Sequence, residues 1–512
     1  MVSKVLIEKN AYYDSVTLMS LSGSISKQEG VEQAVVSMAT QMNKDLLENI
    51  GLLVDEVKEA SENDLIIAIK GDTEERLEEV ISLINEQLNS KKQSKKKDGN
   101  KITKTVNGAI NLMADANVAV ISVRGDYAAR EARQALKKGL HVMIFSDNVT
   151  IDEERELKEL GRKEGLLVMG PDCGTAIINQ TGLCFANKVK AGNIGLVAAS
   201  GTGLQEVTVQ IDRLGYGISQ AIGVGGRDLH EEIGGIMMLE SLKALDKDEK
   251  TEVIVLISKP PALVVQEKIL KQIEETSKPV VVCFLDGDEK EVEKVGAVFA
   301  KTLNQAAIAA IKILDPSMDF LKKKDSNIEE LAIKEKEKIA DSQKYIRGLF
   351  CGGTLTSEAL TIIRPYVDGI KSNVAKKEHE KLKDVFVSNG HTLLDLGDDV
   401  FTFGKPHPMI EPSLRNDRIL QEAADPKTAV LLLDFELGYG SHNDPVGVSY
   451  ETLIEAQEIA KRDGRYLPII AYICGTYNDK QNYDEQANKL KALNIFIADS
   501  NEEAAMLATK FI

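Results

Sequence analysis

Short apolar runs alternate with amphipathic stretches through the middle of the chain. Val118–Val123, His141–Phe145 and Leu166–Met169 are apolar runs, and the segments between them, Tyr127–Lys138 and Asp152–Glu164, have helical spacing. This alternation is typical of parallel strands joined by crossover helices, because such strands are buried on both faces. The pattern from residue 102 onward therefore predicts a parallel sheet covered by helices.

The same alternation occurs twice more along the chain. A second group of apolar runs predicts another sheet, and a third group resembles the second in order and spacing, which indicates two related flavodoxin-like domains. The second group is Ile194–Ala199, Ile218–Val224, Val253–Ser258 and Val280–Leu285, and the third is Ile346–Cys351, Ala429–Phe435, Pro468–Cys474 and Ile495–Ala498.

The amino-terminal part of the chain has a different pattern, which predicts a small α+β domain. Ser15–Leu21 is apolar and β-branched and predicts a strand, whereas Val31–Ile50 has helical spacing. Leu65–Ile69 predicts a second strand, and Thr73–Leu88 a charged amphipathic helix. The basic run Lys91–Gly99 has no apolar anchors and predicts a solvated linker.

These patterns predict a multidomain α/β protein. The stretch before the last domain is rich in Lys and Glu and predicts a helical linker. The predicted boundaries are 1–90 for the α+β domain, 91–101 for the basic linker, 102–190 for a Rossmann-like domain, 191–313 for the first flavodoxin-like domain, 314–345 for the helical linker and 346–512 for the second flavodoxin-like domain.

Charge and cysteine content narrow the expected function. The 512 residues carry a formal net charge of −17, which argues against a nucleic-acid surface and against docking on an anionic membrane. The five cysteines form no C-x-x-C pair, as expected for a reducing compartment. The start of the chain lacks a secretory apolar core, and no stretch approaches the length of a membrane span. We therefore expect a cytoplasmic protein.

The most informative feature is a strand–turn–helix unit that occurs twice, at Ile194–Glu206 and at Ile346–Glu358. A tight turn at a helix N-terminus leaves backbone N–H groups free where the helix dipole favours negative charge. Two such turns suggest a small anion held between two helix ends. The alternative is a pair of ordinary strand-to-helix turns. The candidate binding residues are Ser200, Gly201, Thr202 and Gly203 in the first turn and Gly352, Gly353 and Thr354 in the second.

The hydroxyls of these turns have two candidate roles. Thr202 and Thr354 either cap their helices or donate to the ligand, and Thr202 with Gln205 has the form of a capping box. Ligands in parallel sheets bind beyond the carboxyl ends of the strands. In the second sheet those ends carry Ser200–Gly203, Gly225–Asp228, Lys259–Pro261 and Asp286–Asp288.

Several motifs resemble a known enzyme family. Met169–Gly174, Ile194–Thr202 and Gly223–Asp228 look like the α subunit of succinyl-CoA synthetase, and the stretch from Ile346 looks like the carboxyl-terminal domain of its β subunit. With Phe403–Pro412 between them, the chain resembles the FdrA family. The resemblance implies that residues 102–190 form a CoA-binding-type domain and that both flavodoxin-like domains are of the ligase type.

The chain departs from the synthetases at three places. No Gly-rich turn for the CoA phosphates precedes Val118, and Asp286–Gly296 lacks the histidine that the synthetases phosphorylate. The first hundred residues are too short for an ATP-grasp domain. The resemblance to the FdrA family implies a subunit of oxamate carbamoyltransferase, which converts oxalurate and phosphate to oxamate and carbamoyl phosphate in allantoin and purine catabolism. It implies no cofactor, two further, unrelated subunits as partners, and a homo-oligomer.

Two alternatives to the carbamoyltransferase remain open. One is a CoA-dependent acyl-CoA synthetase of the NDP-forming type, or an acyl-CoA-binding protein, with CoA in the cleft around Ser122–Asp126 and Phe145–Asn148. The other is a non-catalytic scaffold subunit.

Positive charge and proton-transfer groups are expected near the anion. Arg227 follows Gly225 and Gly226 at a strand end and is a candidate catalytic residue, with a surface ion pair as the alternative. Three prolines stiffen the segment 405–415, in which Lys405 and Arg415 are candidate binding residues and His407 a candidate catalytic residue; the alternative is a subunit contact.

A further candidate segment, 434–445, follows a buried strand. Gly438 and Gly440 allow close backbone approach to a ligand, and His442 is a candidate for orienting a carbonyl oxygen or moving a proton. Asp434, His442 and Asp444 match no strong metal-ligand spacing, so no metal is expected. Cys173 and Cys351 stand at strand ends as candidate nucleophiles or as small buried residues.

Overall fold

The computed structural model describes residues 2–512 except 12, 14, 27, 41–42, 45–46, 49–50, 98–102, 104, 319–326 and 403–404. The chain forms two compact units. The first comprises Met1–Lys104 with Thr402–Pro406, and the second comprises Thr105–Phe401 with His407–Ile512. None of the described helices has the length and apolar character needed to cross a bilayer.

The first unit is a small antiparallel sheet with helices packed against it. The strand order is β1-β3-β2, and the apolar core includes Leu18 and Ile25 of α1 and Leu77 and Ile84 of α4. Its elements are β1 (Val2–Glu8), α1 (Ser15–Ser26), β2 (Val31–Met38), α3 (Asp55–Glu59), β3 (Leu65–Gly71) and α4 (Glu74–Lys97).

Three local predictions for this unit are wrong. The strand predicted at 15–21 is helix α1, because Leu18, Leu21 and Ile25 recur at helical spacing and are buried together. The helix predicted at 31–50 begins as strand β2, in which alternate residues are buried. Helix α4 continues through Lys97, so the first part of the predicted linker 91–101 is helical, and its remainder lies outside the described residues.

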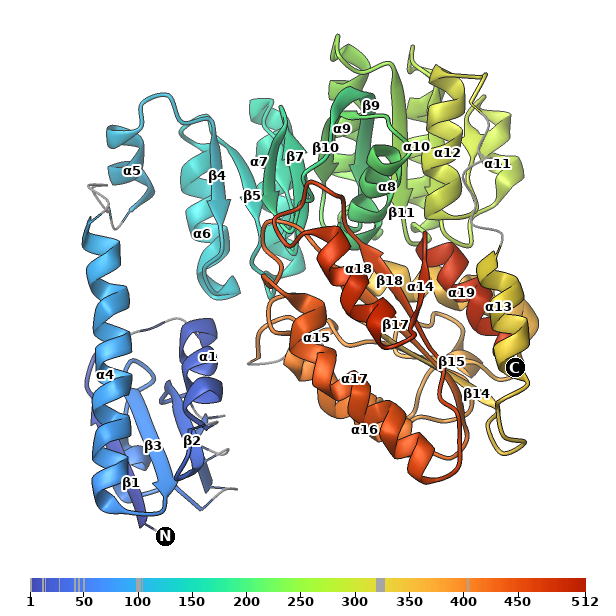
Figure 1. Ribbon diagram of the computed structural model, residues 1–512. Coiled ribbons are helices and arrows are strands. Elements are labelled where there is room, and N and C mark those ends of the chain that lie inside the picture. The colour runs from blue at the N-terminus through green and yellow to red at the C-terminus, as the bar shows by residue number, and fades with distance from the viewer. Residues whose placement is uncertain are drawn as a thin grey trace. The chain divides into compact units, whose positions relative to one another are not determined.

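The second unit contains three sheets (Figure 1). The first is a three-stranded parallel sheet of order β4-β5-β6, as the apolar runs predict. Its elements are α5 (Val106–Leu112), β4 (Val118–Ile121), α6 (Gly125–Leu136), β5 (His141–Ile144), α7 (Ile151–Glu164) and β6 (Val168–Met169).

The seven-stranded sheet has the order β13-β12-β11-β9-β10-β7-β8. It is parallel except at the hairpin of β7 and β8, which lies before the boundary predicted at 191. Its elements are β7 (Thr175–Ile178), β8 (Thr181–Cys184), β9 (Ala191–Ala198), α8 (Gly201–Arg213), β10 (Ile218–Gly223), α9 (Ile236–Lys247), β11 (Val253–Ser258), α10 (Leu263–Glu274), β12 (Val280–Phe284), α11 (Glu289–Lys294), β13 (Val298–Phe299) and α12 (Leu303–Leu314).

The six-stranded sheet is parallel, with the order β15-β16-β14-β17-β18-β19. The apolar runs predicted four of its strands but not β15 or β16. Helix α13 (Asn327–Lys336) precedes this sheet, and part of the predicted helical linker lies outside the described residues. The other elements are β14 (Tyr345–Phe350), α14 (Gly353–Ile363), β15 (Lys371–Ser372), β16 (Thr392–Asp395), α15 (Asp399–Thr402), α16 (Asn416–Ala424), β17 (Thr428–Glu436), α17 (Pro445–Arg462), β18 (Ile469–Cys474), α18 (Tyr483–Ala492), β19 (Phe496–Ala498) and α19 (Asn501–Ala508).

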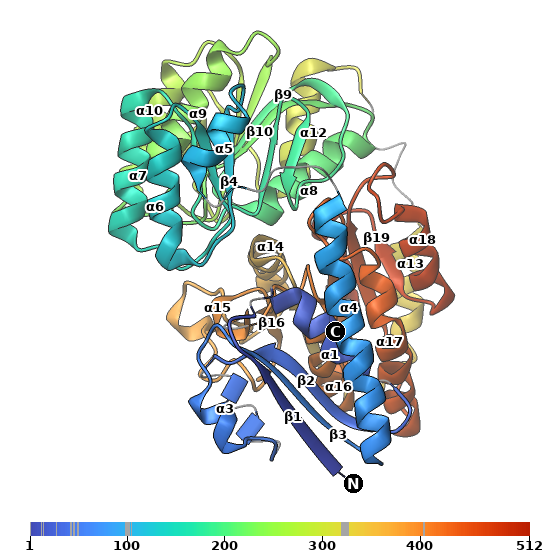
Figure 2. The ribbon, with the colours of Figure 1, turned by 90° about the vertical axis from the view of Figure 1, so that its left-hand side faces the viewer.

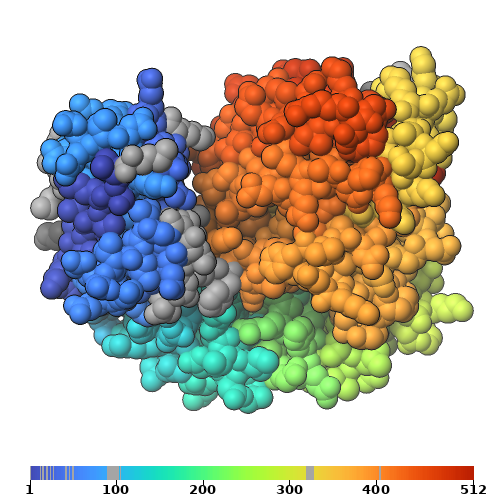
Figure 3. Space-filling model, turned by 90° about the horizontal axis from the view of Figure 1, so that it is seen from below, coloured from blue at the N-terminus to red at the C-terminus, as the bar shows by residue number. Residues whose placement is uncertain are grey.

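The two larger sheets share one apolar core. Helices α8 and α12 of the first and α14 and α19 of the second contribute buried side chains to the same cluster. Figure 2 shows α8 close to α14, and Figure 3 shows the orange and red surface of residues beyond 340 lying against the green surface of residues 200–300. The α/β fold class is confirmed, and the repeated units face each other within it.

Two glutamates at equivalent places in the repeated unit stabilise this junction reciprocally. Glu206 of α8 accepts from the first N–H of α19, that of Asn501, at 3.3 Å, and Glu358 of α14 accepts from the first N–H of α12, that of Leu303, at 2.6 Å. Each carboxyl thus binds the N-terminus of a helix from the other sheet, where the helix dipole favours it.

We expect the substitution Glu358→Gln to flatten the dependence of stability on pH. Burial raises the pKa of Glu358 from 4.5 to about 8, and the neighbouring Glu206 adds to the shift. A carboxyl with a raised pKa in the folded state contributes stability below its unfolded pKa and loses that contribution as the pH rises through its folded pKa. Urea unfolding between pH 5 and 8.5 measures this loss. The exposed Glu455→Gln is the control, and an unchanged pH slope in Glu358→Gln would contradict the assignment.

Candidate functional site

The two repeated turns meet where α8 and α14 begin. The hydroxyls of Ser200 and Thr354 lie 2.6 Å apart and form a hydrogen bond, and both residues are buried. A Cβ added to Gly352 would lie 3.0 Å from Thr202 Oγ1, so the second pair of turn residues is also in contact. We refer to this meeting of the two helix N-termini as the helix junction. The structure brings the predicted turn residues together, and their role in binding stays a prediction.

The capping box predicted for Thr202 and Gln205 is wrong. Ser200 is the N-cap of α8, and its Oγ accepts from the N–H of Gly203 at 2.9 Å. Its backbone is extended, as an N-cap requires, whereas Thr202 already lies within the helix. Gln205 instead donates to the carbonyl of Phe185 at 2.8 Å. Thr354 does not cap α14, because its hydroxyl bonds to Ser200.

One of the backbone donors expected at the second turn is already used. The carboxylate of Asp434 accepts from the N–H of Cys351 at 2.7 Å and from that of Gly352 at 3.0 Å. Arg415 Nη1 lies 3.0 Å from Asp434 Oδ1, and both side chains are buried. Gly352 N–H and Arg415 thus both bind Asp434, and their predicted binding roles stay predictions. The donors left at this turn are those of Gly353 and the residue after it.

Two charged residues that the sequence analysis did not select as site residues lie beside Gly353. A Cβ added to Gly353 would overlap Asp395 Oδ2 and would lie 3.3 Å from Lys259 Nζ. Asp395 ends β16, and its Oδ1 accepts from the N–H of Gly397 at 2.9 Å. Burial raises the pKa of Asp395 to about 7, and the charge of Lys259 opposes that rise. Lys259 follows a predicted strand, whereas Asp395 is the last residue of a strand that was not predicted.

His407 lies next to this group. Its Nδ1 accepts from the N–H of Met409 at 3.2 Å, and a Cβ added to Gly397 would overlap its Nε2. Burial lowers the pKa of His407 to about 4, so the ring is neutral near pH 7. Lys405 is exposed and belongs to the first compact unit, whereas His407 belongs to the second. The predicted roles of Lys405 and His407 stay predictions.

Arg227 forms the ion pair that the sequence analysis gave as the alternative to catalysis. Its Nη2 lies 2.8 Å from Glu154 Oε2 and donates to the carbonyl of Val149 at 2.8 Å. Glu154 in turn binds the buried Lys158, whose ammonium also binds Asp228 at 2.8 Å. The two glycines before Arg227 differ in how closely other atoms approach them. A Cβ on Gly225 would overlap the carbonyl of Pro171, and one on Gly226 would meet open space.

The segment 434–445 contacts protein where a ligand was expected. Added Cβ atoms on Gly438 and Gly440 would lie 2.5 Å from the carbonyl oxygen of Phe185 and 2.8 Å from that of Cys184, so these glycines allow close approach to that strand end. His442 Nδ1 accepts from the N–H of Asp444 at 3.0 Å. Among the described residues, His442 forms no hydrogen bond with the side chains of the helix junction. The predicted roles of Gly438, Gly440 and His442 stay predictions.

The candidate cysteines are buried thiols. Burial raises the pKa of Cys173 to about 12 and that of Cys351 well above its ordinary value, so neither is an activated nucleophile. Among the described residues, one group of side chains is close enough together to hold a metal ion: Cys351, Asp434 and Glu436. The guanidinium of Arg415 already lies against Asp434, and a second cation there would be repelled.

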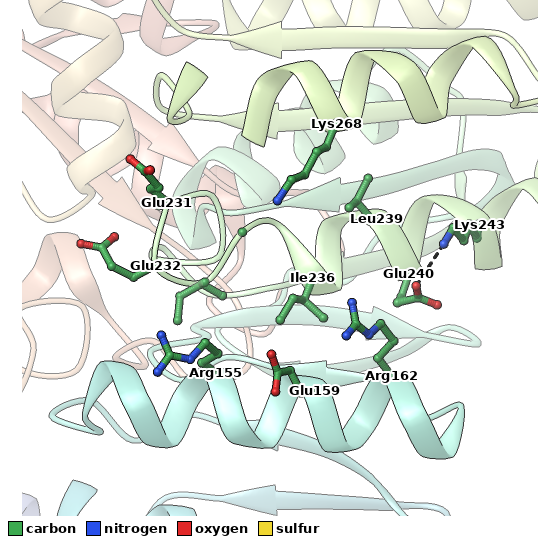
Figure 4. Close-up of a pocket in the computed structure, with 12 residues that line it drawn as sticks. Arg155, Glu159, Arg162, Glu231, Glu232, Ile236, Leu239, Glu240, Lys243 and Lys268 are labelled. Atoms are coloured by element: carbon green, nitrogen blue, oxygen red, sulfur yellow. Dashed lines mark hydrogen bonds and ion pairs between the residues drawn. The ribbon is translucent and has the colours of Figure 1, made fainter. Parts of the chain in front are cut away.

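A pocket of about 490 Å³ opens elsewhere in the second unit, between α7, α9 and α10 (Figure 4). Arg155, Glu159 and Arg162 of α7 face Ile236 and Glu240 of α9 across it. Basic and acidic side chains alternate around its rim, and Lys243 is paired with Glu240 at 3.1 Å. None of the predicted site residues lines this pocket.

Comparisons with known proteins bear on the family. Residues 349–511 match the model of the CoA-ligase family, residues 189–285 that of the CoA binding domain, and residues 1–106 that of the AllF, heavy metal-associated domain. The chain is 47% identical to the uncharacterized protein YahF of Escherichia coli (strain K12) over 99% of this chain and 98% of that protein. The chain belongs to the YahF family.

A further relative of part of the chain is a subunit of a CoA ligase. The chain is 29% identical to the α 2 subunit of the ADP-forming succinate–CoA ligase of Archaeoglobus fulgidus, over 33% of this chain and 58% of that subunit. Among solved structures, the apo dinucleotide-forming acetyl-coenzyme A synthetase 1 of Ca. Korarchaeum cryptofilum aligns with 16% identity over 81% of this chain and 86% of that one, with a TM-score of 0.33.

These findings confirm the resemblance to the succinyl-CoA synthetases and correct the expected activity. The matched families are CoA-ligase and CoA binding domain, and the relative from Archaeoglobus fulgidus is a subunit of a CoA ligase, so the expectation of a carbamoyltransferase is wrong. The narrower likeness to the FdrA family, the partner subunits and the homo-oligomer stay predictions. The matched CoA binding domain covers residues 189–285, whereas the resemblance placed that domain at 102–190.

The amino-terminal family match raises the question of a metal. Heavy metals of that class are bound through cysteine thiolates and imidazoles, and residues 1–106 contain neither cysteine nor histidine. The residues present therefore do not fit a soft metal ion, and we assign no chemistry to one.

Proposed function

We propose that the chain catalyses acyl transfer between an acyl phosphate and the thiol of coenzyme A, with the phosphate held at the helix junction. The observation that carries this proposal is the Ser200–Thr354 hydrogen bond, which places two helix N-termini at one point beside Lys259. Helix N-termini and an ammonium group both favour a phosphate. The matches to the CoA-ligase family and the CoA binding domain support a CoA thioester as the other reactant.

This half of the ligase reaction suits the residues that the chain has. In the synthetases that the chain resembles, phosphorylation by a nucleotide uses a histidine that the segment Asp286–Gly296 does not contain and an ATP-grasp domain for which the first hundred residues are too short. Acyl transfer to a thiol needs neither. The thiol sulfur forms a bond to the acyl carbon, the bond from that carbon to the phosphate oxygen breaks, and phosphate leaves. The demands on the protein are orientation of two anionic reactants and stabilisation of the departing phosphate.

The test is thioester formation from acetyl, propionyl or succinyl phosphate and CoA, followed by absorbance and by phosphate release. We expect Ser200→Ala to lower kcat/KM by roughly 10- to 100-fold, because the variant loses both the cap of α8 and the bond to Thr354. Ser500→Ala is the matched control, since Ser500 is also a buried N-cap, that of α19. The proposal is overturned if purified wild-type protein forms no thioester from any of these acyl phosphates.

A further inference from the structure

Asp395 is a buried residue whose carboxyl group lies at the start of α14, and only one of its two oxygens accepts a hydrogen bond. Its backbone is held by Asn373, whose amide accepts from the N–H of Asp395 and donates to its carbonyl, both at 2.9 Å. Oδ1 accepts from the N–H of Gly397, whereas Oδ2 has no hydrogen-bond donor among the described residues. Asp395 is 8% exposed, and its Oδ2 would overlap a Cβ added to Gly353, so this oxygen lies beside the start of α14.

The other side of the helix junction also has an unused polar group. The hydroxyl of Thr175 is buried without a hydrogen-bond partner, and it lies 3.8 Å from the position of a Cβ on Gly201. Each of the two helix N-termini is therefore flanked by a side-chain oxygen without a donor among the described residues, and that of Thr175 is fully buried. Buried polar groups without partners are rare in folded proteins and are commonly found where a ligand completes the set.

The charges around Asp395 are mixed. Lys259, after β11, is the cation that faces it, and Asp398 and Asp434, from the following loop and β17, are the acids whose charges act on it. The neutral His407 lies beyond Gly397. Burial is the largest influence and raises the pKa of Asp395 to about 7, so near neutral pH the carboxyl gains or loses a proton readily.

We propose that Asp395 is the acid–base residue of the helix junction and that an anion binds there together with a proton. The catalytic part of this inference rests on the proposed function. In the acyl transfer, the proton that accompanies the anion comes from the attacking thiol. The bound acyl phosphate raises the proton affinity of the ionised Asp395, which takes the thiol proton as the carbon–sulfur bond forms. The neutral carboxyl lies beside the phosphate oxygen that leaves when the acyl carbon–oxygen bond breaks, and it returns the proton to that oxygen.

Sulfate is the probe for the binding part, because it stays a dianion throughout the pH range used. We expect the sulfate affinity of the wild-type protein, measured by calorimetry, to fall roughly tenfold between pH 6 and pH 8.5. Asp395→Asn, which cannot ionise, is expected to bind sulfate with the same affinity at every pH in that range. Asp398→Asn is the matched control, since it removes a neighbouring carboxylate but keeps Asp395, and its affinity keeps the pH dependence.

Lys259→Met provides a second variant if Asp395→Asn does not fold. Removing the ammonium raises the proton affinity of Asp395, so the fall in sulfate affinity is expected to move to higher pH. In the acyl-transfer assay, Asp395→Asn is expected to lower kcat by roughly 100-fold.

The outcomes separate the two proposals. A wild-type enzyme that forms thioester, together with a pH dependence of sulfate binding that persists in Asp395→Asn, overturns the inference and leaves the proposed function intact. Absence of thioester formation with pH-dependent sulfate binding that Asp395→Asn abolishes overturns the function and supports the binding role. A wild-type protein that binds no sulfate at any pH overturns the inference, and one that also forms no thioester overturns both.

Discussion

Replacing Arg415 by methionine is expected to lower the free energy of unfolding by about 3–5 kcal/mol. Arg415 is 1% exposed, and its guanidinium lies 3.0 Å from the carboxylate of Asp434, which is itself fully buried. Removing the cation leaves a buried negative charge without its partner, and the neighbouring Glu436, whose pKa burial already raises, cannot compensate it. Guanidinium-induced unfolding, followed by circular dichroism, measures the loss.

A second substitution distinguishes the charge effect from loss of packing. In Arg415→Met combined with Asp434→Asn the uncompensated charge is gone, so we expect part of the lost stability to return. The exposed Arg462→Met, in the same domain, is the control for loss of an arginine side chain and is expected to change little. A double variant no more stable than Arg415→Met would show that packing against Phe435 dominates.

The helix junction was predictable because its signal is local and repeated. Each turn follows an apolar strand and opens a helix, and helix N-termini attract anions whatever the rest of the fold is. The equivalence of Ser200 with Gly352 and of Glu206 with Glu358 follows from aligning two short segments. That alignment indicates that the two turns are related in the fold, and the structure adds that they touch.

Asp395 was not predicted, because the sequence around it has no clear local pattern. Its strand, Thr392–Asp395, has only four residues, and so short an apolar run carries no periodicity that separates strand from loop. The ion-pair partners of Arg415 and Arg227 could not be predicted from the sequence either. Asp434 and Glu154 come next to these arginines only when segments distant in the sequence fold together. In α1, the β-branched Val16 and Thr17 favoured the prediction of a strand. The segment is a helix because this conformation buries Leu18, Leu21 and Ile25 on one side.

The glycine at the start of α14 leads to the second large prediction. We expect Gly353→Ala to lower acyl transfer by roughly 100-fold, because the new methyl group displaces the Asp395 carboxyl and intrudes beside Lys259, and small displacements of reacting groups have large effects on rate. Sulfate affinity is expected to fall roughly tenfold, as a charged hydrogen bond at the helix N-terminus is lost. The backbone of Gly353 is helical, so the variant should still fold, at a cost of about 1–3 kcal/mol for overpacking.

The repeated unit supplies its own control in Gly201→Ala. Gly201 occupies the equivalent position in α8, but its added Cβ would meet no atom closer than 3.8 Å. The same chemical change at the same place in the helix is therefore expected to leave stability nearly unchanged and to reduce sulfate affinity and acyl transfer less than Gly353→Ala does. If Gly353→Ala keeps the wild-type rate and sulfate affinity, the start of α14 is not part of the ligand site, and the acyl phosphate binds elsewhere on the chain.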